Sequence, residues 1–154
     1  MGNKTRLTGA LALLACGFVG VWEGLRTEAY TDIVGVETVC YGETKGVRLG
    51  DSYSKSECDA MLLEGLKRHE TDMRRCLKEP DKIPAKSYVA LVSLTYNIGS
   101  GAFCRSTAAK RLNKGDLAGA CEAATWYNRA GGKKVKGLVN RRSAEYKLCM
   151  EGLK

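Results

Sequence analysis

A run of uncharged residues near the N-terminus is the first feature of the hydrophobic pattern. Residues 7–22, LTGALALLACGFVGVW, contain no charged side chain, and Lys4 and Arg6 precede them. As a helix, these sixteen residues span about 24 Å at ~1.5 Å each, less than the roughly 30 Å hydrocarbon core of a bilayer. The run is therefore only marginal as a membrane anchor.

Three interpretations of this run are open from the sequence. It is the first helix of a globular domain, a cleaved signal peptide, or a weak anchor that first tethers the protein to the inner membrane and later slips out. Residues 13–16, LLAC, bear a weak likeness to a lipobox, for which Leu14 is atypically bulky. The apolar residues surround the helix instead of forming a stripe, and the weak anchor best explains the marginal hydrophobicity. The flanking positive charges then predict that the N-terminus stays cytoplasmic while the remainder is exported.

After residue 29 the pattern has the period of a strand and then that of a helix. Residues 30–44, YTDIVGVETVCYGET, are rich in Val, Thr and Tyr with turn residues at Asp32 and Gly35, which predicts a short β-hairpin. From Ser54 the apolar residues fall at helical spacing, and Ser54 with Glu57 forms the S-x-x-E pattern of a capping box. We expect a long helix to begin there.

The second half of the chain is predicted to be helical. Pro80 and Pro84 bound a linker, after which an apolar helix runs to a stop at residues 97–101, NIGSG. Further helices are predicted at residues 107–113, 116–127 and 138–153. The fold class is therefore α+β, with a small sheet in front and a helical bundle behind.

Charge and composition narrow the chemistry. The chain has 25 Lys and Arg against 17 Asp and Glu, a net charge of +8, which favours polyanionic partners: nucleic acid, acidic membrane or anionic cell wall. His69 is the single histidine and reads as an exposed residue of a charged helix, so a zinc site built on several imidazoles is not expected. Scattered cysteines without a CxxC spacing indicate disulfides made in an oxidising compartment; they are Cys16, Cys40, Cys58, Cys76, Cys104, Cys121 and Cys149.

Two carboxyl groups stand where the pattern changes from helix to hairpin. Hydrolysis of a glycosidic bond needs one carboxylic acid to protonate the leaving oxygen and one carboxylate to activate water. Glu23 ends the apolar run, a setting that favours the protonated acid, and Asp32 begins a turn, where backbone N–H groups and water favour the carboxylate. Thr38 follows and can orient a water with its hydroxyl. On spacing alone, Asp32 is equally well explained as a turn former and Thr38 as a strand residue.

Several segments resemble one family over residues 22 to about 150. They are WEGLR (22–26), AYTDIVGV (29–36), TVCYG (38–42), LVSLTYNIG (91–99), ST (106–107), LNKGD (112–116), Trp126 and GLVNRR (137–142). This set is similar to the T4-lysozyme-like phage endolysins. The resemblance implies a lysozyme-like fold, with a small β-sheet lobe, a mainly helical lobe and the active-site cleft between them. Glu43 departs from the family pattern, in which a histidine is expected, and this puts any salt bridge made by that histidine in doubt.

The resemblance also implies roles for individual residues. Glu23 is the general acid, Asp32 activates the nucleophilic water and Thr38 positions it. An arginine of the closing segment pairs with Glu23, and of the two candidates we prefer Arg142 to Arg141. The analogy pairs the body cysteines as Cys40 with Cys58, Cys76 with Cys104 and Cys121 with Cys149, and leaves Cys16 unpaired.

The expected protein is an exported muramidase that cuts the β-1,4 bond between N-acetylmuramic acid and N-acetylglucosamine and lyses the host cell. The N-terminal run is similar to that of the signal-anchor-release subgroup, which divides the chain into an anchor or first helix (1–22) and a catalytic domain (23–154). Tethering through residues 7–21 would hold the enzyme at the inner membrane on the periplasmic side. We expect no cofactor, metal or nucleic acid, and a monomer.

Three alternatives have different chemistry. A lytic transglycosylase uses the acid but no water, and Asp32 with Thr38 argues against it. A wall peptidase built on Cys40 and His69 requires a free thiolate. A basic membrane-associated binding protein leaves Glu23 unexplained.

Overall fold

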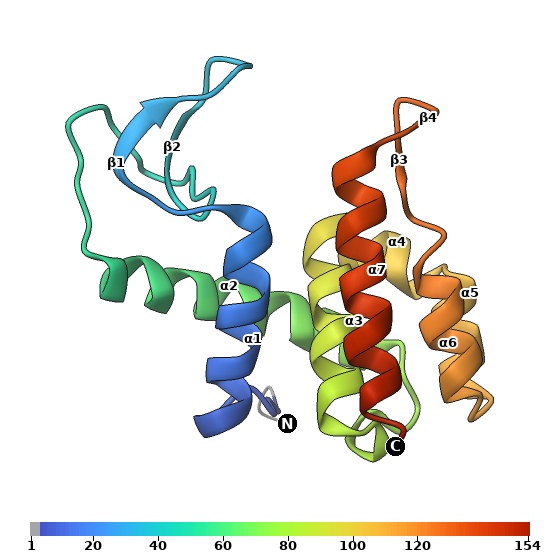
Figure 1. Cartoon of the computed structure of the whole chain (residues 1–154). Coiled ribbons are helices and arrows are strands. Elements are labelled where there is room, and N and C mark those ends of the chain that lie inside the picture. The colour runs from blue at the N-terminus through green and yellow to red at the C-terminus, as the bar shows by residue number, and fades with distance from the viewer. Residues whose placement is uncertain (1–3) are drawn as a thin grey trace.

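A computed structural model describes residues 4–154 and has the expected α+β architecture. A hairpin of two antiparallel strands forms one lobe, helices α3 to α7 form the other, and the long helix α2 runs from beneath the hairpin to the helical lobe (Figure 1). The elements are α1 (Gly9–Glu23), β1 (Arg26–Thr31), β2 (Glu37–Cys40), α2 (Lys55–Arg75), the 3-10 turn η1 (Pro80–Lys82), α3 (Ala85–Ile98), α4 (Ser100–Cys104), α5 (Thr107–Asn113), α6 (Leu117–Ala124), β3 (Arg129–Ala130), β4 (Lys133–Lys134) and α7 (Lys136–Glu151).

Two predicted helix boundaries have the expected local chemistry. At the start of α2 the Ser54 hydroxyl accepts from the Glu57 N–H, and the Glu57 carboxylate accepts from the Ser54 N–H, so the capping box is confirmed. Helix α5 has the predicted bounds, and its N-cap Ser106 accepts from the N–H of Ala109. These side chains satisfy backbone donors that have no partner within the helix.

Helix α3 is the centre of the helical lobe. Every residue from Ser87 to Thr95 is buried, and α7 packs along the helix over most of its length. The predicted stop at residues 97–101 is confirmed, since α3 ends at Ile98, but the short helix α4 that follows was not predicted. Gly99, at φ 91°, ends α3 but also starts the short helix α4, because its left-handed conformation redirects the chain without stopping helix formation.

The predicted hairpin is confirmed, although its first strand begins earlier, at Arg26. Tyr30 lies opposite Thr38 and Thr31 opposite Glu37, and Gly35 at φ 83° makes the turn between them. A second, very short hairpin, β3–β4, follows α6 where only a break between helices was expected. It lies at the N-terminal end of α7, on the same side of the molecule as the larger hairpin (Figure 1).

The apolar run at the N-terminus is helix α1 of the folded body. Ala15 and Val19 are buried, and the helix packs against α2 and α3, whereas Leu13 and Val21 remain 78% and 79% exposed. Apolar side chains thus lie on both the buried and the exposed faces of α1, as expected from an apolar run that forms no stripe. Across residues 4–154, the structure contains no helix with both the length and the apolar character needed to cross a bilayer.

A buried carboxylate holds the chain just before α1. Glu70 of α2 is fully buried and accepts hydrogen bonds from the Thr5 hydroxyl at 2.5 Å, from the Arg6 N–H at 2.8 Å and from the Tyr88 hydroxyl. The Arg6 guanidinium lies over the Tyr88 ring and donates to the carbonyls of Pro80 and Ile83. The positive flank of the apolar run is thus fixed to α2, η1 and α3.

The expected disulfide pairing is confirmed. Bonds join Cys40 to Cys58, Cys76 to Cys104 and Cys121 to Cys149, and Cys16 in α1 is free and partly buried. Burial, followed by the negative charge of Asp59, raises the pKa of the Cys16 thiol, which disfavours its reactive thiolate.

Candidate active site

Glu23 is the last residue of α1 and stands where the chain leaves the helix. Gly24, at φ 76°, caps the helix and donates its N–H to the carbonyl of Gly20 at 3.0 Å. A residue with a β-carbon is strained in this left-handed conformation, so the glycine lets the chain turn at once into β1. The Glu23 side chain is 22% exposed, so its carboxyl group is partly shielded yet open to a ligand.

An arginine of α7 pairs with Glu23, and it is Arg141. The Arg141 Nη1 donates to Glu23 Oε1 at 2.7 Å, and the Arg141 side chain is 5% exposed. The preference for Arg142 was wrong. Neighbouring residues of an α-helix point about 100° apart, so only one of the two can face α1. Arg142 points elsewhere and donates to the carbonyl of Tyr127 at 3.3 Å.

Behind Arg141 lies a buried ion cluster that the sequence reasoning missed. Glu145 of α7 is buried; its Oε2 lies 3.4 Å from Arg141 Nε, and its Oε1 lies 2.6 Å from Arg142 Nε. The Ser93 hydroxyl of α3 donates to Glu145 Oε2 at 2.6 Å. A signal was present, because Glu145 follows the two arginines by four and three residues, the spacing of side-chain pairs on a helix.

Asp32 and Thr38 lie together at the turn of the hairpin. Asp32 Oδ1 accepts from the N–H groups of Val34 and Val36, at 2.9 and 2.8 Å. The Val36 carbonyl accepts both the Asp32 N–H at 2.9 Å and the Thr38 hydroxyl at 3.0 Å. Within the described residues, Asp32 Oδ2 has no hydrogen-bond donor and is open to a water. The buried Thr38 hydroxyl, having given its proton to Val36, is placed to accept from a water.

The three predicted catalytic residues are therefore not all joined by hydrogen bonds. Asp32 and Thr38 share Val36, whereas Glu23 lies before the start of β1 and pairs with Arg141; among residues 4–154 no hydrogen bond joins Glu23 to the other two. Two carboxyl groups that act on a glycosidic bond from two sides need no bond to each other, since the substrate and a water must fit between them.

Tyr96 of α3 borders the site and was not predicted as a functional residue. Burial, then the negative charges of Glu23 and Glu43, raise the pKa of the Tyr96 hydroxyl to about 12. Its ring packs on Gly65 of α2, where an added β-carbon would lie 3.4 Å from Tyr96 Cε2. His69, expected to be exposed, is instead partly buried, with its ring 4.9 Å from that of Tyr96.

The wall peptidase alternative is wrong, because Cys40 is bonded to Cys58 and has no free thiol.

Glu43, the departure from the family pattern, lines a hollow next to this region. The hollow has a volume of about 470 Å³ and is lined by Glu43, Lys45, Ala60, Met61, Glu64 and Arg68. Burial raises the pKa of the Glu43 carboxyl group, and the positive charge of Arg68 opposes the shift. In place of the histidine, this chain therefore has an acid whose electrostatic partner is on α2.

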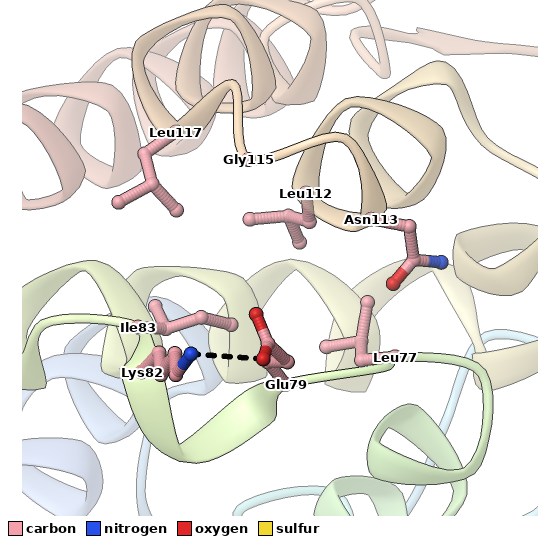
Figure 2. A pocket seen from close by; sticks show the side chains of 8 residues that line it. All are labelled: Leu77, Glu79, Lys82, Ile83, Leu112, Asn113, Gly115 and Leu117. Carbon is pink, nitrogen blue, oxygen red and sulfur yellow. Dashed lines mark hydrogen bonds and ion pairs between the residues drawn. The ribbon is translucent and has the colours of Figure 1, made fainter.

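A smaller hollow lies away from these residues. It has a volume of about 150 Å³ between η1 and the α5–α6 turn, where Leu77, Ile83, Leu112 and Leu117 point toward one another (Figure 2). Lys82 and Glu79 form an ion pair of 2.9 Å at its edge. None of the predicted catalytic residues lines it, so it is no part of the site.

Known proteins resemble the chain over most of its length. The profile of the family described as "Phage lysozyme" matches residues 20–145. The SAR-endolysin of Enterobacteria phage P21 is 42% identical over 131 residues, covering 84% of this chain and 78% of that protein. The SAR-endolysin of Pseudomonas phage phiKMV is 39% identical over 153 residues, covering 97% and 93%. Among solved structures, an endolysin from Escherichia coli O157:H7 phage FAHEc1 superposes with a TM-score of 0.80 at 31% identity, covering 98% and 94%.

Proposed function

This chain belongs to the phage lysozyme family, and we propose that it hydrolyses the β-1,4 bond between N-acetylmuramic acid and N-acetylglucosamine with Glu23, Asp32 and Thr38 as catalytic residues. It is a phage endolysin of the lysozyme type, a glycoside hydrolase that acts on bacterial peptidoglycan. The observation that carries the catalytic proposal is the position of Glu23, a partly shielded carboxyl group at the helix end that opens into the hairpin.

In the proposed reaction Glu23 donates its proton to the glycosidic oxygen as the bond to the anomeric carbon breaks. Asp32 accepts a proton from a water, which attacks that carbon, and the products are a reducing muramic end and a free hydroxyl on the next sugar. The open Oδ2 of Asp32 and the Thr38 hydroxyl supply two contacts for this water. Arg141 holds the Glu23 carboxyl group in one orientation.

A Glu23→Gln variant tests the acid directly. The amide has nearly the same shape, and the Arg141 contact to an oxygen is retained, but it cannot donate the proton that the leaving group needs. Lysis of purified peptidoglycan should fall below a few per cent of the wild-type rate while the melting temperature stays close to that of the wild type. Residual lysis above that level, in a folded variant, excludes Glu23 as the acid.

We further propose that the protein is exported with residues 7–21 in the inner membrane and becomes active when this segment leaves the bilayer. The relatives from phages P21 and phiKMV are named SAR-endolysins, and this chain has the uncharged run with Lys4 and Arg6 before it. On this proposal residues 1–22 serve as the anchor and residues 23–154 as the catalytic domain, although the two pack together in the released enzyme. The net charge of +8 favours approach to an anionic wall, and the enzyme acts there as a monomer.

The contacts of the folded state explain why a tethered form would be inactive. While residues 7–21 are in the bilayer, Thr5 and Arg6 lie on its far side and cannot reach Glu70. Glu23, directly after the segment, is held at the membrane surface away from Arg141. Release would therefore complete the Glu70 cluster and the Glu23–Arg141 pair in the same event.

Membrane fractionation with N-terminal sequencing tests the tether. Newly made protein should sediment with the membranes, and after collapse of the membrane potential it should become soluble with the N-terminal segment attached. A soluble product that begins beyond residue 15 shows cleavage by a signal peptidase and overturns the release proposal. Activity of the purified full chain on isolated peptidoglycan is independent of this result, so the two proposals fail separately.

A further inference from the structure

The cluster behind the proposed acid contains a charge that the reaction itself does not use. Two arginines, Arg141 and Arg142, occupy neighbouring positions on α7, and both are buried. Arg141 reaches Glu23, so its positive charge acts directly on the group that must hold a proton. The proposed proton donor therefore has one guanidinium 2.7 Å away and a second on the next residue of α7.

We propose that Glu145 is a positioning residue that holds Arg141 against Glu23 and offsets the combined positive charge of Arg141 and Arg142 at that carboxyl group. The inference rests on the proposed role of Glu23 as the acid. Glu145 does not contact the reacting atoms and acts only through Arg141.

The geometry of the cluster fixes Arg141 from several sides. Its Nε lies 3.4 Å from Glu145 Oε2, and its Nη2 donates to the Ser93 carbonyl and hydroxyl, both at 3.4 Å. Its remaining nitrogen, Nη1, is thereby directed to Glu23. A long side chain that is held by one contact alone samples several rotamers, and these added contacts remove that freedom.

The same carboxylate is the counter-charge for both arginines. Arg142 Nε forms an ion pair with Oε1 at 2.6 Å, and Oε2 accepts hydrogen bonds from Arg142 Nη2 at 3.0 Å and from the Ser93 hydroxyl at 2.6 Å. Burial raises the pKa of Glu145, and Arg142, Ser93 and Arg141 each oppose that shift. Two guanidinium groups and a hydroxyl are thus directed at the one carboxyl group, which makes Glu145 the shared partner of both arginines.

Other charged or titratable groups act on the same region. The charges of Glu23, Glu43, Arg141 and Arg68 act on Tyr96 of α3, and those of Glu145, Arg141 and Glu23 act on Arg142. Glu43, in the loop after β2, has Arg68 of α2 as its electrostatic partner, and Asp32 is the facing carboxyl group of the proposed catalytic pair. Apart from Glu23, the carboxyl group that contacts Arg141 directly within residues 4–154 is that of Glu145.

Replacing Glu145 with Gln keeps the shape of the side chain and removes its charge. The two arginines then act on Glu23 without compensation, so the loss of activity at alkaline pH, where the acid is deprotonated, should begin at lower pH. We expect the alkaline limb to move down by about one pH unit, since a single buried charge that acts through one intervening side chain has an effect of that order. At the midpoint of the wild-type limb the rate should fall about fivefold, and at higher pH about tenfold, with a smaller loss on the acid side.

Two companion variants separate charge from structure. Glu145→Asp keeps the charge, so its alkaline limb should stay at the wild-type pH even where the rate is lower. Glu151→Gln removes the same charge from the same helix, but Glu151 pairs with Lys86, so both rate and limb should remain as in the wild type. The measurement is the pH profile of kcat/KM on purified peptidoglycan, with the fold checked by circular dichroism.

The possible results are distinct. A Glu145→Gln variant that loses activity equally at every pH, with an unmoved limb, shows a purely structural role and overturns the inference. A limb that moves down in Glu145→Asp overturns it too, because charge is then not the cause; this result is read against the wild type and stands even where Glu145→Gln does not fold. If Glu23→Gln is inactive and the limb in the Glu145 variants is unmoved, this inference alone fails. If Glu23→Gln retains activity, the proposed function fails.

Discussion

Two exposed positions of α1 allow the membrane anchor to be strengthened without a change to the folded enzyme. Ala10 and Gly17 are exposed, and a β-carbon added at Gly17 meets no atom within 4 Å. Gly20 is unsuitable, because an added β-carbon there lies 3.2 Å from Tyr41 Cε1, and Ala12 is buried in the core. We therefore predict that Ala10→Leu combined with Gly17→Leu delays release and lysis.

The size of the delay depends on how the two leucines change the free energy of the membrane-bound form relative to the released form. The segment is helical in the bilayer and in α1, so the change in helix propensity cancels. In the bilayer each leucine favours insertion by about 0.3 to 0.6 kcal/mol, about 1 kcal/mol for the pair. In the released enzyme both side chains face water, where substitutions shift stability by roughly 0.5 kcal/mol or less. The ratio of membrane-bound to soluble protein should therefore rise about fivefold.

The assay is membrane fractionation at fixed times after expression, together with the time of lysis. Leu13→Ala is the matched control, because Leu13 is 78% exposed in the folded enzyme and its loss weakens the anchor alone; it should release earlier. All purified variants should cut isolated peptidoglycan at the wild-type rate. If the double leucine variant partitions as the wild type does, or if both variants shift in the same direction, residues 7–21 do not act as a releasable anchor.

Three further outcomes are expected. Asp32→Asn should be severely impaired in peptidoglycan hydrolysis while Thr38→Ser keeps part of the activity; an active Asp32→Asn variant points to a reaction without water. Removing the bond between Cys121 and Cys149 by a double serine substitution should lower the free energy of unfolding by about 3.6 kcal/mol, from the entropy of a loop of 28 residues, and a loss below 1 kcal/mol in denaturant titration contradicts this. Glu70→Gln should cost about 1 to 3 kcal/mol, because the amide cannot accept from all three buried donors; an unchanged denaturation midpoint shows that the cluster does not fix the N-terminal flank.

Features that depend on local spacing were predictable from the sequence. The capping box of α2 and the N-cap Ser106 of α5 depend only on residues three apart in the sequence, so the start of each helix was located correctly. The hairpin followed from the Val, Thr and Tyr residues of this segment and from the turn residues Asp32 and Gly35. The three disulfides of the protein, by contrast, were paired by family resemblance, since six cysteines alone allow fifteen pairings.

Features that depend on the phase and burial of helices were not predictable. Choosing Arg141 over Arg142 requires knowing which way α7 faces α1, and a run of two arginines carries no such information. Glu70 stands in a charged stretch of α2 and reads as a solvent-exposed residue. It is fully buried, and its donors come from two distant places in the chain, residues 5–6 and Tyr88. Such contacts exist only once the chain is folded.

Mass spectrometry of the products from purified peptidoglycan tests the central claim most directly. If Glu23 protonates the leaving oxygen and Asp32 directs a water to the anomeric carbon, the wild-type enzyme should release fragments with reducing N-acetylmuramic ends, and Glu23→Gln should release none. Anhydro-muramic ends show a transglycosylase that uses no water, and intact glycan strands with cut peptides show a peptidase. Either of these results contradicts the account.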